Sequence, residues 1–350
     1  MILIINSGSE SIKWKIFSAR GGNDKLEVVK EGERDVLDQN LFSKAFEDEL
    51  NSISNLKIRA VGHRVVHGGE KFREPIKITD VNLAEFEKLN YLAPIHNPFN
   101  ILGIKICRNI FKEIPQFAVF DTEFFKDLPE KAYKYALPED IADKFGFRRY
   151  GFQGTSHKYA AKTAAEKSKK PFNKIKIISC HLGGGSSVVA IKNGKAIDTS
   201  MGFTPLEGLV MMTRPGNIDA GIVLELAKEF SPEKVGKILN EKSGMKGICG
   251  ESDMRKILEK IKVGDKKAMS ALDVFVYSIQ KYIGAYYAIL GGCDILVFTG
   301  AIGFNSAKIR NMVCKNLKIL RETKVLAIEN DEELAIARKI KTLFIKLQNL

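Results

Sequence analysis

The chain has 350 residues, of which 45% are hydrophobic and 28% charged, and its formal net charge is +13. This length and composition predict two globular domains, each large enough to bury a core, and exclude a disordered chain. Lysine and arginine are spread along the sequence without a basic tail, so no nucleic-acid partner is expected. No apolar stretch is long enough to span a membrane, and the first residues lack the basic start of a signal peptide. The five scattered cysteines include no CxxC pair, which indicates a reducing compartment and a cytoplasmic location.

The first part of the sequence mixes strand and helix patterns. Alternating or continuous apolar runs predict strands at 2–5, 12–17, 26–30, 57–69 and 117–121. Helical patterns cover 41–53, 82–92 and 99–111. Asn82 is the predicted N-cap of the second helix, and Pro98 is a break before the third. Only short turns separate the first three strands, which predicts an antiparallel meander.

A second series of strands begins at 176 and reaches 198. It has a strand at KIIS, a turn at HLGGGSS, and a hairpin whose Asn193–Gly194 pair predicts a type I′ turn. The preceding segment 122–160 is polar and mixed. Further on, one strand is predicted to begin at 295 and another covers 325–328. Helices are predicted at 219–229, 254–262, 267–289, 307–320 and 331–348. The order of strand, small polar turn and strand therefore occurs twice, which indicates a duplicated unit with a ligand between the halves.

Three turns rich in glycine and hydroxyl residues follow predicted strands, with the sequences NSGSESIK, HLGGGSS and TGAIGFNS. The backbone N–H groups of such turns bind anions, so the three turns predict a site for the phosphates and nucleoside of a nucleotide. The alternative is that they are turns without a ligand. Lys13 either holds a phosphate or is an exposed strand cation, and Lys192 is interpreted as exposed. The GxxxxGK[ST] phosphate-binding pattern is absent.

Two arginines and two acids are candidates for charge chemistry. Arg64 lies in GHRVVHGG and Arg214 in MMTRPGN, and their guanidinium groups suit a carboxylate and a phosphoryl group. Asp121 ends a predicted strand, where ligand sites of α/β sheets gather, although it could instead cap the next turn. Glu332 could support the dipole of the last helix or reach a Mg²⁺ ion.

At this level of detail the chain resembles the acetokinase (acetate kinase) family, within the acetate and sugar kinase/Hsp70/actin superfamily. Matching stretches run nearly from end to end, and they include NSGSESIK, GHRVVHGGEKF, LAPIHNP, VFDTEF, RRYGFQGTSHKYAA, CHLGGGSS, IDTSMGFTPLEGL, TRPGNID, SDMR, VFTGAIGFNS and DEELAIAR. The resemblance implies an α/β fold of two duplicated ribonuclease-H-like (actin-like ATPase) domains with an interdomain cleft. The expected N-terminal lobe covers 1–125 plus 333–350, and a nucleotide-binding and dimerisation lobe covers 126–332.

The resemblance also implies the reaction ATP + acetate ⇌ ADP + acetyl phosphate with Mg²⁺ (or Mn²⁺), in a homodimer. Asn6 would contact the transferring phosphoryl group, Arg64 and Arg214 would neutralise the carboxylate and the phosphoryl group, and Glu332, with Asn6, would hold the metal near Asp121. His96 matches a family histidine near the site. The small acyl pocket would be formed by Val66, Ile95, Phe152 and Pro205. The implied nucleotide contacts are Ser11, Lys13, His181, Gly183, Gly184, Gly185, Asp253, Met254, Arg255, Gly300, Ala301, Ile302, Gly303 and Asn305.

Three positions depart from the family pattern, and all lie on the nucleotide and phosphoryl path. Gln153 replaces the histidine of GFHGTSH, Gly184 replaces the asparagine of HLGNG, and Phe304 replaces the acid of GIGENS. Glutamine donates a neutral hydrogen bond but cannot be cationic. These departures keep two alternatives open: an acyl kinase with another donor (GTP or pyrophosphate) or with propionate as acceptor, and a weakly active nucleotide-binding descendant.

A Gln153→His variant is expected to raise kcat roughly 30-fold or more. The imidazolium would restore a charge-assisted donor to the phosphoryl group, which is worth about 2–4 kcal/mol in the transition state. Steady-state formation of acetyl phosphate measures the change. A decrease in kcat would instead show that the site is adapted to glutamine.

Overall fold

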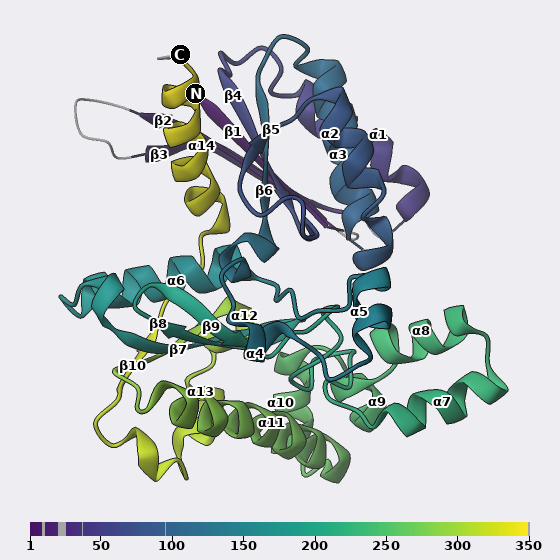
Figure 1. The fold of residues 1–350 in the computed structure, drawn as a ribbon, viewed down its shortest axis with the longest axis vertical. Coiled ribbons are helices and arrows are strands. Elements are labelled where there is room, and N and C mark those ends of the chain that lie inside the picture. Colours follow the sequence, from purple (N-terminus) through teal and green to yellow (C-terminus); the bar gives the residue numbers. More distant parts are fainter. Residues whose placement is uncertain (9–10, 20–25, 37, 95, 349–350) are drawn as a thin grey trace. The chain divides into compact units, whose positions relative to one another are not determined.

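The structure is a computed structural model that describes residues 1–8, 11–19, 26–36, 38–94 and 96–348. Ile95, one of the predicted acyl-pocket residues, lies outside the described residues. The chain divides into two compact units, Met1–Lys126 with Asp331–Leu350, and Asp127–Asn330. Each unit is built on one mixed β-sheet (Figure 1).

The sheet of the first unit has the strand order β3-β2-β1-β4-β6-β5. β1 to β3 pair antiparallel, which confirms the predicted meander, and β4 and β6 extend the sheet parallel to β1. A short β5 closes the edge antiparallel to β6. The strands are β1 (Ile2–Ser7), β2 (Ser11–Ala19), β3 (Leu26–Asp35), β4 (Ala60–Val65), β5 (Ile76–Lys77) and β6 (Gln116–Phe120).

Helices cover both faces of this sheet (Figure 1), because successive residues of β1 point to opposite faces and the first four, Ile2 to Ile5, are all apolar. Leu3 and Ile5 share a core with residues of α1 and α3. Ile2 and Ile4 share another with Ile336 of α14. α14 therefore belongs to the first unit although it ends the chain. The helices of this unit are α1 (Phe42–Asn51), α2 (Asp80–Glu87), α3 (Asn97–Ile110) and α14 (Glu332–Gln348).

Two predicted helix starts were wrong. The second helix begins at Asp80 with Thr79 as its N-cap, and Asn82 is the third helical residue of a capping box with Thr79. The third helix begins at Asn97, before Pro98, because proline fits the first turn of a helix, where its missing N–H costs no bond.

His63, next to Arg64 on β4, makes the stability of this unit depend on pH. The ring is 1% exposed, Nε2 contacts Gln116 Oε1 at 2.8 Å, and burial lowers the pKa of His63 to about 4. Between an ordinary pKa near 6.5 and pH 4 only the unfolded chain binds this proton, so the free energy of unfolding should fall by about 3 kcal/mol across that window. Urea unfolding at pH 7 and pH 4.5 measures the loss. A His63→Gln variant should lose less stability over the same window, and an equal loss would contradict the assignment.

The sheet of the second unit has the order β11-β10-β7-β8-β9. β7, β8 and β9 pair antiparallel, and Asn193 and Gly194 have φ of 53° and 81°, which confirms the predicted hairpin turn. β10 lies parallel to β7, and β11 parallel to β10. The strands are β7 (Lys176–Leu182), β8 (Ser186–Lys192), β9 (Lys195–Thr199), β10 (Ile295–Thr299) and β11 (Lys324–Ala327).

The two sheets share one topology: an antiparallel three-stranded meander whose first strand is followed by two parallel strands. This is the expected duplicated ribonuclease-H-like arrangement. In the second unit α11 packs on one face of the sheet, and α6 covers β7 and β10 with buried alanines. The helices are α4 (Glu130–Tyr133), α5 (Glu139–Phe145), α6 (Gly154–Lys167), α7 (Ala220–Glu229), α8 (Pro232–Glu241), α9 (Gly244–Cys249), α10 (Met254–Lys262), α11 (Lys266–Leu290), α12 (Gly300–Asn305) and α13 (Ala307–Cys314).

Three predictions for this unit need correction. The segment 122–160 holds α4, α5 and the start of α6, because its helices are too short for a clear apolar period. The expected loop after β10 is the helix α12. The helix predicted at 307–320 ends at Cys314. Within the described part of the chain, no helix combines the length and apolarity needed to cross a membrane.

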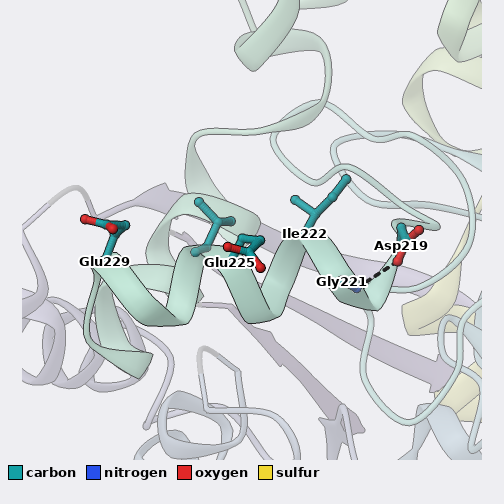
Figure 2. Close-up of a pocket in the computed structure, with 6 residues that line it drawn as sticks. Asp219, Gly221, Ile222, Glu225 and Glu229 are labelled. Atoms are coloured by element: carbon teal, nitrogen blue, oxygen red, sulfur yellow. Dashed lines mark hydrogen bonds between the residues drawn. The ribbon is translucent and has the colours of Figure 1, made fainter.

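One helix of the second unit, α7, has no buried residue. Ile222 and Leu224 are 50% and 66% exposed. A shallow pocket of about 530 Å³ lies along this helix, and Figure 2 shows residues that line it from Asp219 to Glu229. None of the predicted site residues lines it.

Candidate active site

In the first unit, three predicted site residues lie where neighbouring parallel strands end. Asn6 is near the end of β1, Arg64 is near the end of β4, and Asp121 follows β6 directly, in the short helix Asp121–Phe125. The carboxyl ends of parallel strands meet at one edge of a sheet, so the topology gathers the three side chains.

Arg64 is the centre of this group. Its Nε and Nη2 donate to Asp121 Oδ2 at 3.1 and 2.5 Å, and its Nη1 donates to Asn6 Oδ1 at 3.0 Å. Asp121 is 1% exposed. Burial opposes the charge of Arg64, but the carboxylates of Asp121 and Glu332 outweigh burial and raise the pKa of Arg64 above its usual value. The guanidinium is thus permanently cationic and held in one orientation.

The start of α14 adds acids to the same group. Glu332 Oε2 lies 3.2 Å from Arg64 Nε, and Asn6 Nδ2 donates to Glu333 Oε1 at 2.8 Å. Lys15 Nζ lies 3.5 Å from Asp331 Oδ1 and 3.8 Å from Glu333 Oε2. Burial opposes the charge of Lys15, and these carboxylates outweigh it and raise its pKa. The result is a cluster of alternating charges at the ends of β1, β4 and β6, to which the middle of β2 contributes Lys15.

The oxygen atoms of this cluster suit a hard divalent cation. Asn6 offers an amide oxygen, and Asp121, Glu332 and Glu333 offer carboxylates. Within the described residues, no three or more His, Cys, Asp or Glu side chains form a complete metal site. Mg²⁺ commonly uses one or two carboxylates and takes its remaining ligands from water and substrate phosphates, so the residues fit Mg²⁺.

Two other predicted residues of the first unit lie close by in sequence. Val66 follows Arg64 by two positions, is buried, and its N–H donates to Asn100 Oδ1 at 3.0 Å. His96 is the N-cap residue of α3. Both side chains therefore sit on segments fixed to the sheet and to α3.

Lys13 and Ser11 lie on β2, where Lys13 is the backbone partner of Asn6. The Nζ of Lys13 pairs with Glu33 on β3, and both side chains are about half exposed. This exposed pairing agrees with the interpretation of Lys13 as an exposed strand cation.

The predicted residues of the second unit include Arg214, which is partly buried. Its Nη1 donates to Pro205 O at 3.3 Å, and burial lowers its pKa. No Asp or Glu of the described chain lies within ion-pair distance of it. A desolvated guanidinium without an acid partner favours binding an anion.

The loop that carries Pro205 and Arg214 is held in place by Glu207. Its carboxylate accepts a bond from Arg149 Nη2 at 2.7 Å and another from the Tyr135 hydroxyl. Burial and the Glu207 carboxylate raise the pKa of Tyr135. Met211 N donates to Arg214 O at 2.9 Å, which closes the turn.

Gly244, the first residue of α9, packs directly on this turn. Its φ is +61°, and a Cβ there would lie 2.2 Å from Met211 O and 2.6 Å from Arg214 O. A Gly244→Ala variant should therefore lose about 2–4 kcal/mol of stability and, because the turn must move, most of its kcat. Thermal unfolding and steady-state kinetics measure both effects.

Gly250 supplies the matched control. Its φ is +74°, but a Cβ there would meet nothing within 4 Å. Gly250→Ala should cost only about 1 kcal/mol and leave kcat unchanged. Equal effects of the two substitutions would mean that the close approach of Gly244 to the Arg214 turn is unimportant.

Gln153 and the glycine-rich turn after β7 lie beside Arg214. A Cβ on Gly185 would lie 3.4 Å from Gln153 Nε2 and 3.7 Å from Arg214 Nη1, so glycine leaves space between these donors. Phe152, before Gln153, is 2% exposed. A Cβ on Gly184 would meet nothing within 4 Å, so the turn has room for the asparagine of the family pattern.

The turns after β7 and β10 lie side by side. A Cβ on Gly300, whose φ is +77°, would lie 2.6 Å from Leu182 O, and one on Gly303 would lie 3.5 Å from Leu182 Cβ. His181 Nδ1 bonds to Ser156 Oγ at 2.7 Å, and Gly183 N donates to Ser186 Oγ at 3.2 Å. The structure therefore brings His181 and Gly183–Gly185 close to the start of α12. That helix contains Gly300, Ala301, Ile302, Gly303 and Asn305.

The predicted residues Asp253, Met254 and Arg255 lie at the start of α10. Asp253 is the N-cap, and hydrogen bonds from the exposed Arg255 lower the pKa of Asp253 to about 2. Met254 is buried in the core that also contains Leu182. Phe304 is half-buried, and its carbonyl accepts a bond from Arg310 at 2.5 Å.

Sequence reasoning missed several residues that contact the predicted ones. Lys15 lies two residues after Lys13 on β2, and side chains two apart in a strand point to the same face. The alternation of the strand could therefore have identified Lys15. Glu333 adjoins Glu332. Glu207, His157 and Ser187 have no local signal, because their partners are 22 to 72 residues away in sequence.

The comparisons with known proteins agree over nearly the whole chain. The model of the acetokinase family matches residues 21–348. The chain belongs to the acetokinase family. It is 42% identical to the acetate kinase of Carboxydothermus hydrogenoformans, over 97% of this chain and 98% of that protein. Among solved structures, the acetate kinase of Porphyromonas gingivalis is 36% identical with a TM-score of 0.88, covering 98% of this chain and 99% of that one. The propionate kinase of Francisella tularensis is 34% identical with a TM-score of 0.87, over 97% and 98% of the chains.

The two groups of side chains, one around Arg64 and one around Arg214, fit the phosphoryl-transfer chemistry of the acetokinase family. The first group consists of a cation, an amide and carboxylates, and the second consists of a cation and an amide beside a glycine-rich turn. Phosphoryl transfer needs such an arrangement, since catalysis rests on positioning and charge neutralisation.

Proposed function

We propose that this acetokinase family member transfers the terminal phosphoryl group of ATP to acetate, reversibly, giving ADP and acetyl phosphate. The observation that carries the proposal is the partly buried guanidinium of Arg214, which has no acid partner among the residues that the structure describes and lies with Gln153 beside the glycine-rich turn. An anionic ligand satisfies this cation, and the neighbouring glycines leave the space that a phosphoryl group requires.

In the proposed reaction an acetate oxygen attacks the γ-phosphorus, and the bond from that phosphorus to the bridging oxygen of ADP breaks. Acetate is already ionised at neutral pH, so no general base is required. Arg214 neutralises the equatorial oxygens of the transferring group, and Gln153 donates a hydrogen bond to it. Arg64 binds the acetate carboxylate and the incoming phosphoryl group, in an orientation that Asp121 holds.

Asn6, Asp121 and Glu332 are the proposed holders of Mg²⁺, which when bound neutralises charge on the β- and γ-phosphates. Asn6 also contacts the phosphoryl group. The side chains of Val66, Ile95, Phe152 and Pro205 limit the size of the acyl group, and His96 lies near them.

The nucleotide contacts follow from the paired turns of the second unit. His181 and Gly183–Gly185 are the proposed phosphate contacts of this unit, and the N–H group of Gly183 is already bonded to Ser186 Oγ. Ser11 and Lys13 are further proposed phosphate contacts. The start of α12 (Gly300, Ala301, Ile302, Gly303 and Asn305) and the start of α10 (Asp253, Met254 and Arg255) bind the nucleoside.

A hydroxamate assay for acetyl phosphate tests the proposal. Purified protein should form acetyl phosphate from acetate with ATP, and chelation by EDTA should remove the activity until Mg²⁺ is added. GTP and pyrophosphate should support lower rates than ATP. Formation of acetyl phosphate with pyrophosphate but not with ATP would overturn the donor assignment, and no product with any donor would overturn the proposed function.

Propionate is the second candidate acceptor. The apolar side chains proposed for the pocket discriminate one methylene by only about 1–3 kcal/mol, and a related structure is that of a propionate kinase. The ratio of kcat/KM for acetate and propionate decides between them, with acetate expected to be preferred.

We also propose a cytoplasmic homodimer formed through the second domain, with domains at 1–125 plus 333–350 and 126–332. The exposed Ile222, shown in Figure 2, and the exposed Leu224 of the same helix α7 support a contact surface on that domain. Light scattering of the purified protein should give twice the mass of 39.0 kDa, and a monomer at micromolar concentration would contradict the proposal.

A further inference from the structure

Gln153 has an unusual backbone conformation. Its φ of 57° is left-handed, and it is one of three non-glycine residues with positive φ in the described chain. Such a backbone conformation costs a non-glycine residue about 1 kcal/mol or more and persists only where the surrounding structure fixes it. The backbone of Gln153, immediately before α6, is therefore held by its surroundings and not by local propensity.

A line of buried hydrogen bonds runs from this amide into the core. Ser187 Oγ donates to Gln153 Oε1 at 2.6 Å, and His157 Nε2 lies 2.7 Å from the same Ser187 Oγ. His157 Nδ1 lies 2.8 Å from Ser179 Oγ. Ser179, Ser187 and His157 are fully buried. His157 belongs to α6, Ser179 to β7 and Ser187 to β8, so the bonds join the helix to the sheet and water does not compete for them.

The direction of each bond follows from the Gly185 carbonyl, which lies 3.3 Å from the amide nitrogen of Gln153. A carbonyl oxygen can only accept, so the NH₂ group of Gln153 faces Gly185 and Oε1 faces Ser187. The single hydroxyl proton of Ser187 then goes to Oε1. His157 must donate from Nε2 to Ser187, and its Nδ1 accepts from Ser179.

The histidine in this line stays neutral. Burial, and then the neighbouring His181, lower the pKa of His157 well below its ordinary value. A neutral imidazole has one donor and one acceptor nitrogen, so its tautomer sets the direction of every bond out to Gln153.

We propose that Ser187, held by His157 and Ser179, is a positioning residue that fixes the Gln153 amide with its NH₂ group toward the phosphoryl group. The inference rests on the proposed function. Without the Ser187 hydroxyl only the longer bond to the Gly185 carbonyl, at 3.3 Å, orients the amide. The amide then turns more readily, and the turned form places its carbonyl oxygen against the anion and removes the donor. The NH₂ group and the oxygen of the glutamine amide have nearly the same shape, so it is the bond from Ser187 that keeps the NH₂ group on the side of the phosphoryl group.

A double-mutant cycle tests the proposal. Ser187→Ala should lower kcat about tenfold and leave KM for acetate within about twofold, because the amide acts on the transferring group. Ser187→Thr, which keeps the hydroxyl, should retain kcat within about threefold. In a Gln153→Ala background, Ser187→Ala should change kcat less than about twofold. An equal loss of kcat in both backgrounds, or no loss in the natural background, would overturn the positioning role.

A spectroscopic measurement separates this inference from the proposed function. Nitrogen NMR of the histidine-labelled protein should find His157 protonated at Nε2 and bare at Nδ1 at pH 7, with its signal identified by its loss in a His157→Gln variant. The opposite tautomer would overturn the bond directions even in an active kinase. A protein with the expected tautomer but no kinase activity would instead overturn the proposed function.

Discussion

Arg214→Met is expected to lower kcat by about a thousandfold or more while leaving the protein as stable as before, or more stable by up to about 1 kcal/mol. An arginine that neutralises a transferring phosphoryl group is worth about 10³–10⁵ in rate. The gain in stability has a separate cause. Arg214 is desolvated, its pKa is lowered by burial, and its Nη1 donates to Pro205 O at 3.3 Å and lies 4.0 Å from the sulfur of Met211. Replacing such a cation by an apolar side chain of similar length is neutral or stabilising.

Single-turnover kinetics and thermal unfolding of the same preparations measure both effects. Arg149→Met is the matched control, because Arg149 is an arginine of the same unit that has an acid partner, Glu207, at 2.7 Å. This control should lose about 2 kcal/mol or more, since Glu207 would be left without its cation. A large loss of stability in Arg214→Met would show that Arg214 has a structural partner, and an unchanged kcat would remove it from the site.

Arg64→Met is expected to cost both activity and stability. Asp121 is 1% exposed and takes two of its bonds from Arg64 at 3.1 and 2.5 Å, and Glu332 lies 3.2 Å away. Removing the cation leaves these carboxylates buried together, which should lower the free energy of unfolding by about 3 kcal/mol. It also removes the proposed ligand of the acetate carboxylate, so kcat/KM for acetate should fall by about a thousandfold.

Urea unfolding separates the two losses. In Arg64→Met/Asp121→Asn the more deeply buried of the two carboxylates is gone and only that of Glu332 stays unpaired by Arg64, so a large part of the lost stability should return while activity stays low. Lys88→Met controls for removal of a surface cation: Lys88 is 71% exposed and pairs with Glu85, so the change should cost less than about 1 kcal/mol and leave kcat unaltered. If the double variant were as unstable as Arg64→Met, the cost would not come from the unpaired carboxylates.

The different results expected for Arg64→Met and Arg214→Met depend on whether each arginine has an acid partner, which sequence patterns do not show. Arg64 and Arg214 are both arginines in short motifs, and both were predicted to neutralise anions. The structure shows that one is held by carboxylates of its own unit, whereas the other has none at ion-pair distance among the described residues. The partners Asp121 and Glu332 are 57 and 268 residues from Arg64 in sequence, so only the folded sheet brings them together.

The same division holds for the fold. The meander of β1 to β3, the type I′ hairpin between β8 and β9, and the duplication of the strand order follow from local apolar alternation and turn residues, which have short periods and are visible in the sequence. Helix boundaries near Asn82 and Pro98 were misjudged because capping depends on which side chain reaches a free N–H, and one or two residues change that.

Sequence alone determined the family, the two repeats of one topology, and the residue types available for phosphoryl transfer, because these depend on motifs and on periodicity along the chain. Tertiary structure alone decided which charges are already paired, which glycines leave space for a ligand, and which way the Gln153 amide faces. Those properties are set by hydrogen bonds and ion pairs between distant segments, and such bonds exist only after the strands have been placed beside one another.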